Sequence, residues 1–305
     1  MAEQPLRLLF DSELRYGSKE HYFHFLWGYL LPAVREIYRS RTDTPKYHYL
    51  FESCGPVMDR VTEEVIALFA LNARISSLHC TLEQNAAATV LPRWDIYLLR
   101  DFVLGLEVAP YSRMSKRTFR QRLLRDLMRP EFVKGFRADL SCIRSLFLAH
   151  VRCGETDLKQ ADKGRKYYVL ARSSMPDFYA QHGQAKIKGY GTSRRSLQGI
   201  SAFIERFNNP ALNLARYEPG KQTLVHQIRT FSSASGVIGI KGAEFANLLW
   251  APKDCRVIMI RPSKMLTAPV QGKLASLLGL EFSELVVPGD GHLNLMDMEF
   301  GEIFT

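Results

Sequence analysis

The chain has 305 residues, of which 46% are apolar and 24% charged, and this balance excludes an intrinsically disordered protein. The net charge of +10 favours an anionic partner, such as a nucleoside diphosphate, a membrane surface or a nucleic acid, without choosing among them. The five cysteines are scattered and form no CxxC pair, which argues against a disulfide framework or a zinc site and suits a reducing cytoplasm.

The first half of the chain alternates short apolar strands with helices. Strand-like runs occupy residues 6–10 and 47–51, and apolar residues recur at helical spacing over residues 23–38 and 61–71. Residues 97–104 fit either element. Such alternation predicts an α/β layer structure with a parallel sheet.

A basic segment, residues 113–137, follows these elements. Its apolar residues recur at roughly helical spacing, which predicts an amphipathic basic helix that ends near Pro130. Two interpretations stay open: a solvated helix face packed through its leucines, or a contact with an anionic membrane surface. The sequence shows no signal peptide and no run near the ~20 apolar residues of a membrane span. It therefore predicts a cytoplasmic protein, free or peripheral at the cytoplasmic membrane face.

A polar, charge-rich stretch at residues 154–165 is the best linker candidate, and it divides the chain into domains 1–153 and 154–305. Beyond it, strands and helices alternate regularly, which predicts a doubly wound, Rossmann-like domain. The expected strands are residues 166–170, 211–217, 236–240, 256–260 and 281–287, and the expected helices are residues 196–207, 221–231, 243–250 and 271–279.

The strongest local signal for a ligand lies between the strand at 236–240 and the helix at 243–250. The tight Lys241-Gly242 turn aims free backbone N–H groups and the positive end of a helix dipole at one spot. Gly242 has no side chain to keep an anion away, and Lys241 adds a full positive charge. An ordinary turn after a buried strand explains the same residues without a ligand.

Residues 223–262 resemble the C-terminal signature of glycosyltransferase family 61, in which a Gly-rich turn follows a strand and leads into a helix with an Asn-Leu-Leu run. Residues 167–174 are similar to the family's strand that ends in Ser-Arg, and residues 193–205 and 273–287 resemble further segments in the same order. The stretch HYFHFLWGYLLPAV at 21–34 is similar to the family's opening motif, N-Y-Y-H-F-x-x-D-x-L-P. The matching positions of the C-terminal signature are Gln227, Gly239, Gly242, Ala243, Asn247, Leu248, Leu249 and Pro252.

The chain departs from the family pattern at several places. Lys241 replaces the histidine of the turn, Glu244 its second glycine, and His226 the glutamate of the preceding helix. Around Trp27 and Gly28 the chain lacks the acid of the opening motif. These departures keep a catalytically inactive relative as an alternative to an active enzyme.

The resemblance implies a GT-B fold, in which two Rossmann-like domains face a central cleft. It also implies inverting, metal-independent transfer from a nucleotide-sugar, UDP-linked by expectation, to a saccharide or glycoconjugate acceptor, with no further cofactor. The acidic residues agree, because they form no Asp-x-Asp triplet for a divalent ion. Cations and amides must then stabilise the leaving diphosphate. Arg172, at the family's arginine position, Lys241 and the amides around Gly242 and Ala243 are the candidates.

The other donor-site candidates carry weaker arguments. Arg194 and Arg195 are further phosphate ligands, because a guanidinium matches phosphate in a bidentate manner. A carboxylate at Glu244 suits a first helical turn on structural grounds alone, and as a ligand it would accept hydrogen bonds from ribose or sugar hydroxyls. Asn247 and Gln227 are donor-site candidates that are equally explained as hydrogen-bonded residues inside helices.

An inverting transfer also needs a base for the acceptor hydroxyl. The resemblance gives this role to His24, and histidine exchanges protons near neutral pH. Asp11, just after the first strand, is the second candidate base. The alternative for His24 is a histidine that merely caps or packs the first helix.

Two other classes of protein fit the sequence less well. A nucleic-acid-binding protein using residues 113–137 would interleave stacking aromatic residues with the basic ones, and the chain has no RNP-like, KH or zinc pattern. A dehydrogenase or a P-loop enzyme would need GxGxxG or GxxxxGK(S/T), and the chain has neither.

Overall fold

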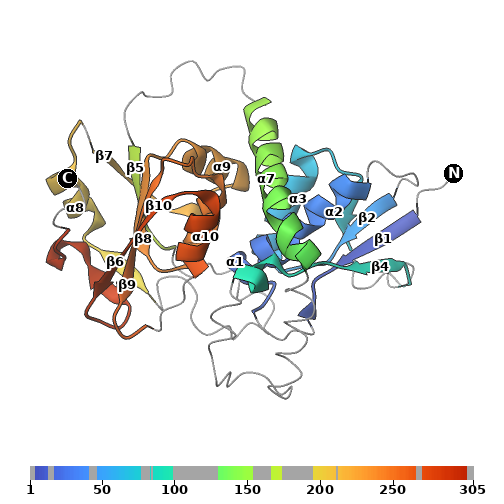
Figure 1. The fold of residues 1–305 in the computed structure, drawn as a ribbon, viewed down its shortest axis with the longest axis horizontal. Helices are drawn as coiled ribbons and strands as arrows, with labels where there is room; N and C mark the ends of the chain where they lie inside the picture. Colours follow the sequence, from blue (N-terminus) through green and yellow to red (C-terminus); the bar gives the residue numbers. More distant parts are fainter. Residues whose placement is uncertain are drawn as a thin grey trace. The chain divides into compact units, whose positions relative to one another are not determined.

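The computed structural model describes residues 4–12, 17–40, 47–76, 83, 85–98, 130–153, 166–173, 195–210, 212–265 and 270–300. Its contacts divide the chain into two compact units, Met1–His150 and Val151–Thr305. Each unit has its own parallel sheet, with helices between successive strands (Figure 1). The α/β fold class expected from the sequence is confirmed.

In the described part of the first unit, parallel strands lie in the order β3-β2-β1-β4. Leu6 of β1 lies opposite Tyr49 of β2, and Leu8 lies opposite Thr89 of β4. From β1 the chain therefore adds β2 and β3 on one side, and it then places β4 on the other side of β1. This reversal puts a topological switch point at the carboxyl ends of β1 and β4, the kind of place where open α/β sheets bind ligands. The strands are β1 (Gln4–Leu9), β2 (Tyr47–Phe51), β3 (Ala73–Ile75) and β4 (Ala87–Val90).

The first predicted helix is confirmed, with a wide turn that the sequence analysis did not predict. It runs through α1 (Tyr22–Phe25), a π-helical turn η2 (Leu26–Leu30) and α2 (Leu31–Ser40). Residues 25–34 are all buried, so the middle of this helix is enclosed on all sides, whereas both of its ends are partly exposed. Turns of π-helix occur frequently at functional sites.

The other helices of this unit differ from the prediction mainly at their ends. The helix predicted at residues 61–71 is α3 (Pro56–Leu68), which begins with a proline, as first turns tolerate well. Residues 94–98 are helical, whereas the rest of the ambiguous segment 97–104 lies outside the described residues. A long helix, α7 (Pro130–Cys153), follows.

In the second unit, the described strands form a parallel sheet in the order β10-β9-β8-β5-β7, which confirms the expected strands of this half. The order reverses between β5 and β8. After β5 the chain forms β7 on one side of β5, and it then forms β8 on the other side. Figure 1 shows α8 on one face of this sheet and α9 and α10 on the other, as in a doubly wound fold. The strands are β5 (Lys166–Leu170), β7 (Asn213–Tyr217), β8 (Gly236–Ile240), β9 (Arg256–Pro262) and β10 (Glu281–Val287).

Two helical predictions in this unit need correction. Residues 196–198 are not helical: they form a strand, β6 (Ser196–Gln198), which pairs with β11 (His292–Asn294). Gly199 adopts φ +70, a left-handed conformation that ends the strand, so the helix α8 starts only at Ile200 (Ile200–Phe207). The helix predicted at residues 243–250 is the 3-10 helix η6 (Ala243–Trp250), which the buried run from Phe245 to Trp250 anchors in the core.

The remaining helical elements complete the second unit: η5 (Pro219–Lys221), α9 (Leu224–Ser232), α10 (Val270–Leu278) and η7 (Leu295–Asp297). One apolar cluster joins β5, β8 and β9 to α8, through side chains such as Val169, Ile238 and Phe203. This core holds the carboxyl ends of the strands and the first turn of α8 in fixed positions.

Several sequence-based expectations fall partly or wholly outside the described residues. These are most of the basic segment 113–137, the linker 154–165 and Arg194. Within the described ranges, every helix is too short or too polar to cross a membrane.

Candidate functional site

Four of the predicted donor-site residues meet where β5 and β8 end. Arg172 follows β5, and Lys241, Gly242 and Glu244 follow β8. The Nε of Arg172 lies 3.0 Å from Oε1 of Glu244, and the two side chains are only 9% and 16% exposed. Arg172 Nη1 and Glu244 Oε2 are also buried, and neither has a hydrogen-bond partner within the described part of the chain. Buried polar atoms of this kind call for a ligand or an ordered water.

The β8–η6 turn is more enclosed than the sequence analysis expected. Lys241 is 7% exposed, its backbone N–H donates to Ile260 O at 2.9 Å, and its carbonyl accepts a hydrogen bond from Arg195. A Cβ at Gly242 would lie 2.1 Å from Glu244 Oε2. The carboxylate of Glu244 therefore folds back over the glycine, at the place where the sequence analysis put the anion.

The other predicted donor-site residues divide into two sets. Asn247 and Gln227 bond to each other, with Asn247 Nδ2 donating to Gln227 Oε1 at 2.7 Å, and both are buried between η6 and α9. Their bond joins two helices, in line with the alternative that both are hydrogen-bonded residues inside helices. Ala243 begins η6 directly after the turn. Arg195 lies beside Lys241, 9% exposed.

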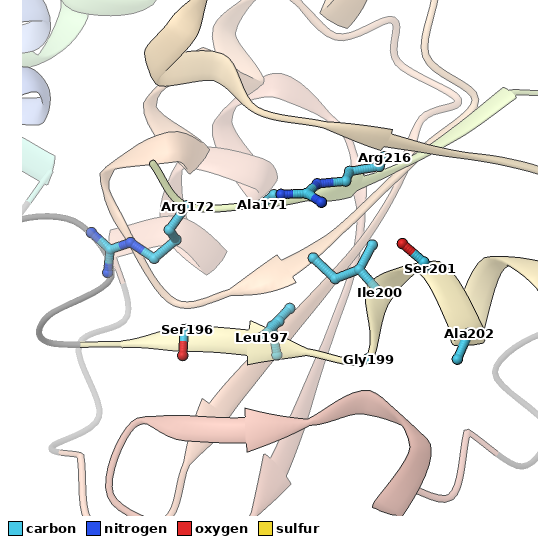
Figure 2. A pocket seen from close by; sticks show the side chains of 9 residues that line it. All are labelled: Ala171, Arg172, Ser196, Leu197, Gly199, Ile200, Ser201, Ala202 and Arg216. Atoms are coloured by element: carbon cyan, nitrogen blue, oxygen red, sulfur yellow. The ribbon is translucent and has the colours of Figure 1, made fainter. Parts of the chain in front are cut away.

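A cavity of about 460 Å³ opens on one side of this junction (Figure 2). It lies between the end of β5, the start of α8 and the strand β7, and its size is typical of a small-ligand site. Arg216 extends from β7 across it toward Ala171, whereas the guanidinium of Arg172 points the other way. The lining residues are Ala171, Arg172, Ser196, Leu197, Gly199, Ile200, Ser201, Ala202 and Arg216.

The first turn of α8 forms one wall of the cavity. Gly199 precedes it and provides no side-chain cap, so the first N–H groups of the helix have no capping oxygen from this residue. A helix N-terminus carries a partial positive charge, and the guanidinium of Arg216, whose side chain is 56% exposed, adds a full one. Glu218 lies 3.7 Å from Arg216 and offsets part of that charge. The cavity suits an anion of the size of a diphosphate.

Sequence reasoning found Arg172 but missed Ser196, Ser201 and Arg216. The two serines were assigned to one predicted helix beginning at Ser196, whereas they lie on either side of its true start at Ile200. Arg216 lies inside a strand with no local pattern to mark it. Its position on β7, the strand beside β5, is the signal that could have found it.

Beyond the carboxyl ends of β1 and β4, hydrogen bonds connect the two predicted catalytic residues with two more. Nδ1 of His24 lies 2.7 Å from Oδ2 of Asp95. Arg93 binds the same carboxylate with both Nε, 2.8 Å from Oδ1, and Nη2, 2.6 Å from Oδ2. Arg93 also donates to the backbone carbonyl of Asp11 at 2.8 Å. The side chains of Arg93 and Asp95 are 1% and 0% exposed, and that of His24 is 17% exposed.

The environment of Asp95 favours its charged form. Burial by itself raises the pKa of a carboxyl group, but hydrogen bonds from Arg93 and His24 outweigh it and hold the pKa of Asp95 below its usual value. An ionised carboxylate can only accept, so the hydrogen of the bond must come from Nδ1 of His24. In this tautomer Nε2 is the unprotonated ring nitrogen.

Two glycines make room for this group of side chains. A Cβ at Gly28 would lie 2.6 Å from Asp95 Oδ1 and 3.0 Å from Arg93 Nε, so the buried carboxylate occupies the space of a side chain at position 28. A Cβ at Gly17 would come within 2.4 Å of the His24 ring. Gly28 is where the sequence lacks the acid of the opening motif, and it lies in the π-helical turn.

Arg93 and Asp95 are the site residues that sequence reasoning missed in this unit. They follow β4, whose short and exposed sequence gave no strand signal. Had β4 been recognised, the Arg-Trp-Asp run after it would have pointed to the same sheet edge as Asp11, which follows β1.

The described residues offer cations and amides rather than metal ligands. Within these ranges, no three His, Cys, Asp or Glu side chains lie close enough together to hold a metal ion. The positive groups that face the cavity are the guanidinium of Arg216 and the first turn of α8, since the guanidinium of Arg172 points away from it (Figure 2).

Comparison with known protein families gives a match. The family model described as Glycosyltransferase 61 matches residues 13–258, which is more than half of the chain and includes residues of both units. No curated protein matches the chain.

Proposed function

Since the chain belongs to glycosyltransferase family 61 and is therefore a glycosyltransferase, we propose that it transfers a sugar from a nucleotide-sugar to a hydroxyl group of a saccharide or glycoconjugate. The proposal includes inversion at the anomeric carbon and no metal on the diphosphate. It also includes the GT-B arrangement, in which two Rossmann-like domains share one cleft.

The donor diphosphate binds, in this proposal, in the cavity beside Arg172 and Arg216. The observation that carries it is the position of this cavity at the reversal of strand order, lined by the uncapped first turn of α8 and by an accessible guanidinium. This differs from the Lys241-Gly242 turn, since Glu244 covers that glycine. Guanidinium groups and helix amides can carry the charge of a leaving diphosphate without a divalent ion.

His24 acts as the base for the acceptor hydroxyl. The hydroxyl oxygen attacks the anomeric carbon from the face opposite the diphosphate, and its proton passes to Nε2 of His24. The bond between the anomeric carbon and the diphosphate oxygen breaks, and the nucleoside diphosphate leaves with the bonding electrons. Asp11 stays the second candidate, since its backbone carbonyl is held next to His24's partners by Arg93.

Calorimetric titration with UDP and other nucleoside diphosphates tests the donor site. Arg216→Ala should weaken binding about tenfold or more, roughly 1.4 kcal/mol, because it removes a full charge from the cavity. Arg172→Ala should weaken binding less, because its guanidinium points away from the cavity (Figure 2) and pairs with Glu244. Arg206→Ala, which removes an exposed arginine at the far end of α8, is the matched control and should leave the affinity unchanged.

Transfer assays with a panel of nucleotide-sugars test the reaction itself. His24→Ala should abolish transfer while donor binding persists, and EDTA should leave the rate unchanged. Unaltered affinity in both arginine variants would reject the phosphate site. Donor binding without turnover for any acceptor would favour a catalytically inactive relative.

A further inference from the structure

The proposed function uses His24 but not the two buried charged residues that are linked to it, Arg93 and Asp95. The three side chains form a hydrogen-bonded relay. It runs from Arg93 through Asp95 to Nδ1 of His24, with every heavy-atom separation between 2.6 and 2.8 Å. Asp95 comes from a segment 71 residues away from His24 in the sequence. Such a contact between distant segments is formed by the fold and is not a local helix-capping bond.

The charges of this relay balance each other. A buried carboxylate is costly unless a cation and good hydrogen bonds compensate it, and the two-pronged contact from Arg93 supplies both. Asp95 is therefore an ionised acceptor that faces the histidine ring. Arg93 itself is fixed by the carbonyl of Asp11 and by the ring of Phe10, 4.1 Å below its guanidinium.

The backbone of the π-helical turn shapes the space around the carboxylate. Any side chain at position 28 would displace Asp95, because a Cβ there lies 2.6 Å from Oδ1 and 2.8 Å from the carboxyl carbon. Asp95 has no room to retreat, since it is 0% exposed and held by two partners. Gly28 thus admits a carboxylate from another segment into contact with the helix that carries His24.

We propose that Asp95 is a positioning residue, which fixes the orientation and tautomer of His24 so that Nε2 faces the acceptor hydroxyl as the proton acceptor. Arg93 keeps Asp95 charged, and Gly28 gives it space. The role of His24 as the base rests on the proposed function. The tautomer of His24 depends only on its contact with Asp95. Carboxylate partners of this kind orient histidines in other catalytic sites.

Nitrogen-15 NMR of histidine-labelled protein at mildly alkaline pH tests the proposal without any substrate. His24→Gln assigns the His24 signal among the eight histidines. In the unsubstituted protein His24 should be the Nδ1–H tautomer, and in Asp95→Asn it should move toward the Nε2–H form that free histidine prefers. Gly28→Ala should move it in the same direction while the carboxylate is still present. An Nε2–H tautomer in the unsubstituted protein overturns the proposal, whichever variants fold.

Kinetics provide the second readout. Asp95→Asn should lower kcat by roughly 10²–10⁴-fold and leave the donor KM and UDP affinity unchanged. The matched control is Asp139→Asn, which breaks a carboxylate–arginine pair with Arg35 in the same unit without touching His24. It should change neither the tautomer nor kcat. An equal loss of kcat in both variants would mean that Asp95 acts only through stability.

The two proposals fail separately. If His24 is the Nδ1–H tautomer and depends on Asp95, yet no donor is turned over, the positioning role stands and sugar transfer fails. If transfer depends on His24 while its tautomer ignores Asp95, sugar transfer stands and the positioning role fails.

Discussion

Arg172 and Glu244 show how residues assigned separately to a ligand become partners in the fold. The sequence suggested Arg172 for the phosphates and Glu244 for a hydroxyl group, and the structure pairs them at 3.0 Å with little exposure. The pair leaves Arg172 Nη1 and Glu244 Oε2 without hydrogen bonds in the described part of the chain. These atoms are buried, so their hydrogen-bonding capacity is left unmet within the described residues.

A double-mutant cycle measures this pairing. Arg172→Ala and Glu244→Ala should each lower the free energy of unfolding by about 3 kcal/mol, because each leaves an uncompensated buried charge. The double variant should lose less than the sum of the two, with a coupling of about 1–3 kcal/mol by urea denaturation. The more exposed pair Arg256–Glu281, with side chains 27% and 62% exposed, is the control, with an expected coupling of about 1 kcal/mol or less. Additive losses at Arg172 and Glu244 would contradict the pairing.

Asp95 predicts how stability responds to acid. Its pKa in the folded protein is lowered below the unfolded value of about 3.9, so its charged form contributes stability above that value. This contribution is lost as the pH falls through the lower, folded pKa. Asp95→Asn should therefore be less stable than the unsubstituted protein at neutral pH, and the difference should narrow below about pH 4. Urea denaturation across this range is the measurement, and a difference that does not vary with pH would contradict the assignment.

At the scale of elements, the sequence predicted those that carry a continuous apolar run. The strands β5 and β8 were found because their Tyr-Tyr-Val-Leu and Gly-Val-Ile-Gly-Ile sequences suit a sheet covered on both faces. The strand β4 was missed because Ala87–Val90 is short and largely exposed, with Val90 59% exposed. Backbone pairing to β1 makes it a strand, and a single sequence contains no signal for that pairing.

The same distinction explains which site residues were predicted. Arg172 and the β8–η6 turn follow strands with clear patterns, so their place at the sheet edge could be expected. Asp95 and Arg216 owe their positions to strand order, which brings together segments far apart in the chain. The helix predicted from residue 196 likewise concealed the cavity, because the left-handed Gly199 separates a strand from a helix there.

The whole molecule consists of two compact units, and the cavity belongs to the second alone. Hydrogen-exchange mass spectrometry with and without UDP should therefore show added protection around residues 196–202 and 213–217. Peptides covering α1 and residues 91–98 should be unchanged by UDP alone, because their contacts lie in the other unit. If UDP protected only the peptides that cover α1 and residues 91–98, the nucleotide site would lie in the first unit.

The close approach at Gly28 also constrains how this protein can have diverged. A residue with a side chain at position 28 and a carboxylate at position 95 exclude each other sterically, so substitutions at the two positions should occur together among relatives. A relative with a side chain at position 28 must therefore have lost or shortened the acid at position 95. Correlated substitution of these two positions, 67 residues apart, is the evolutionary trace that this contact should leave.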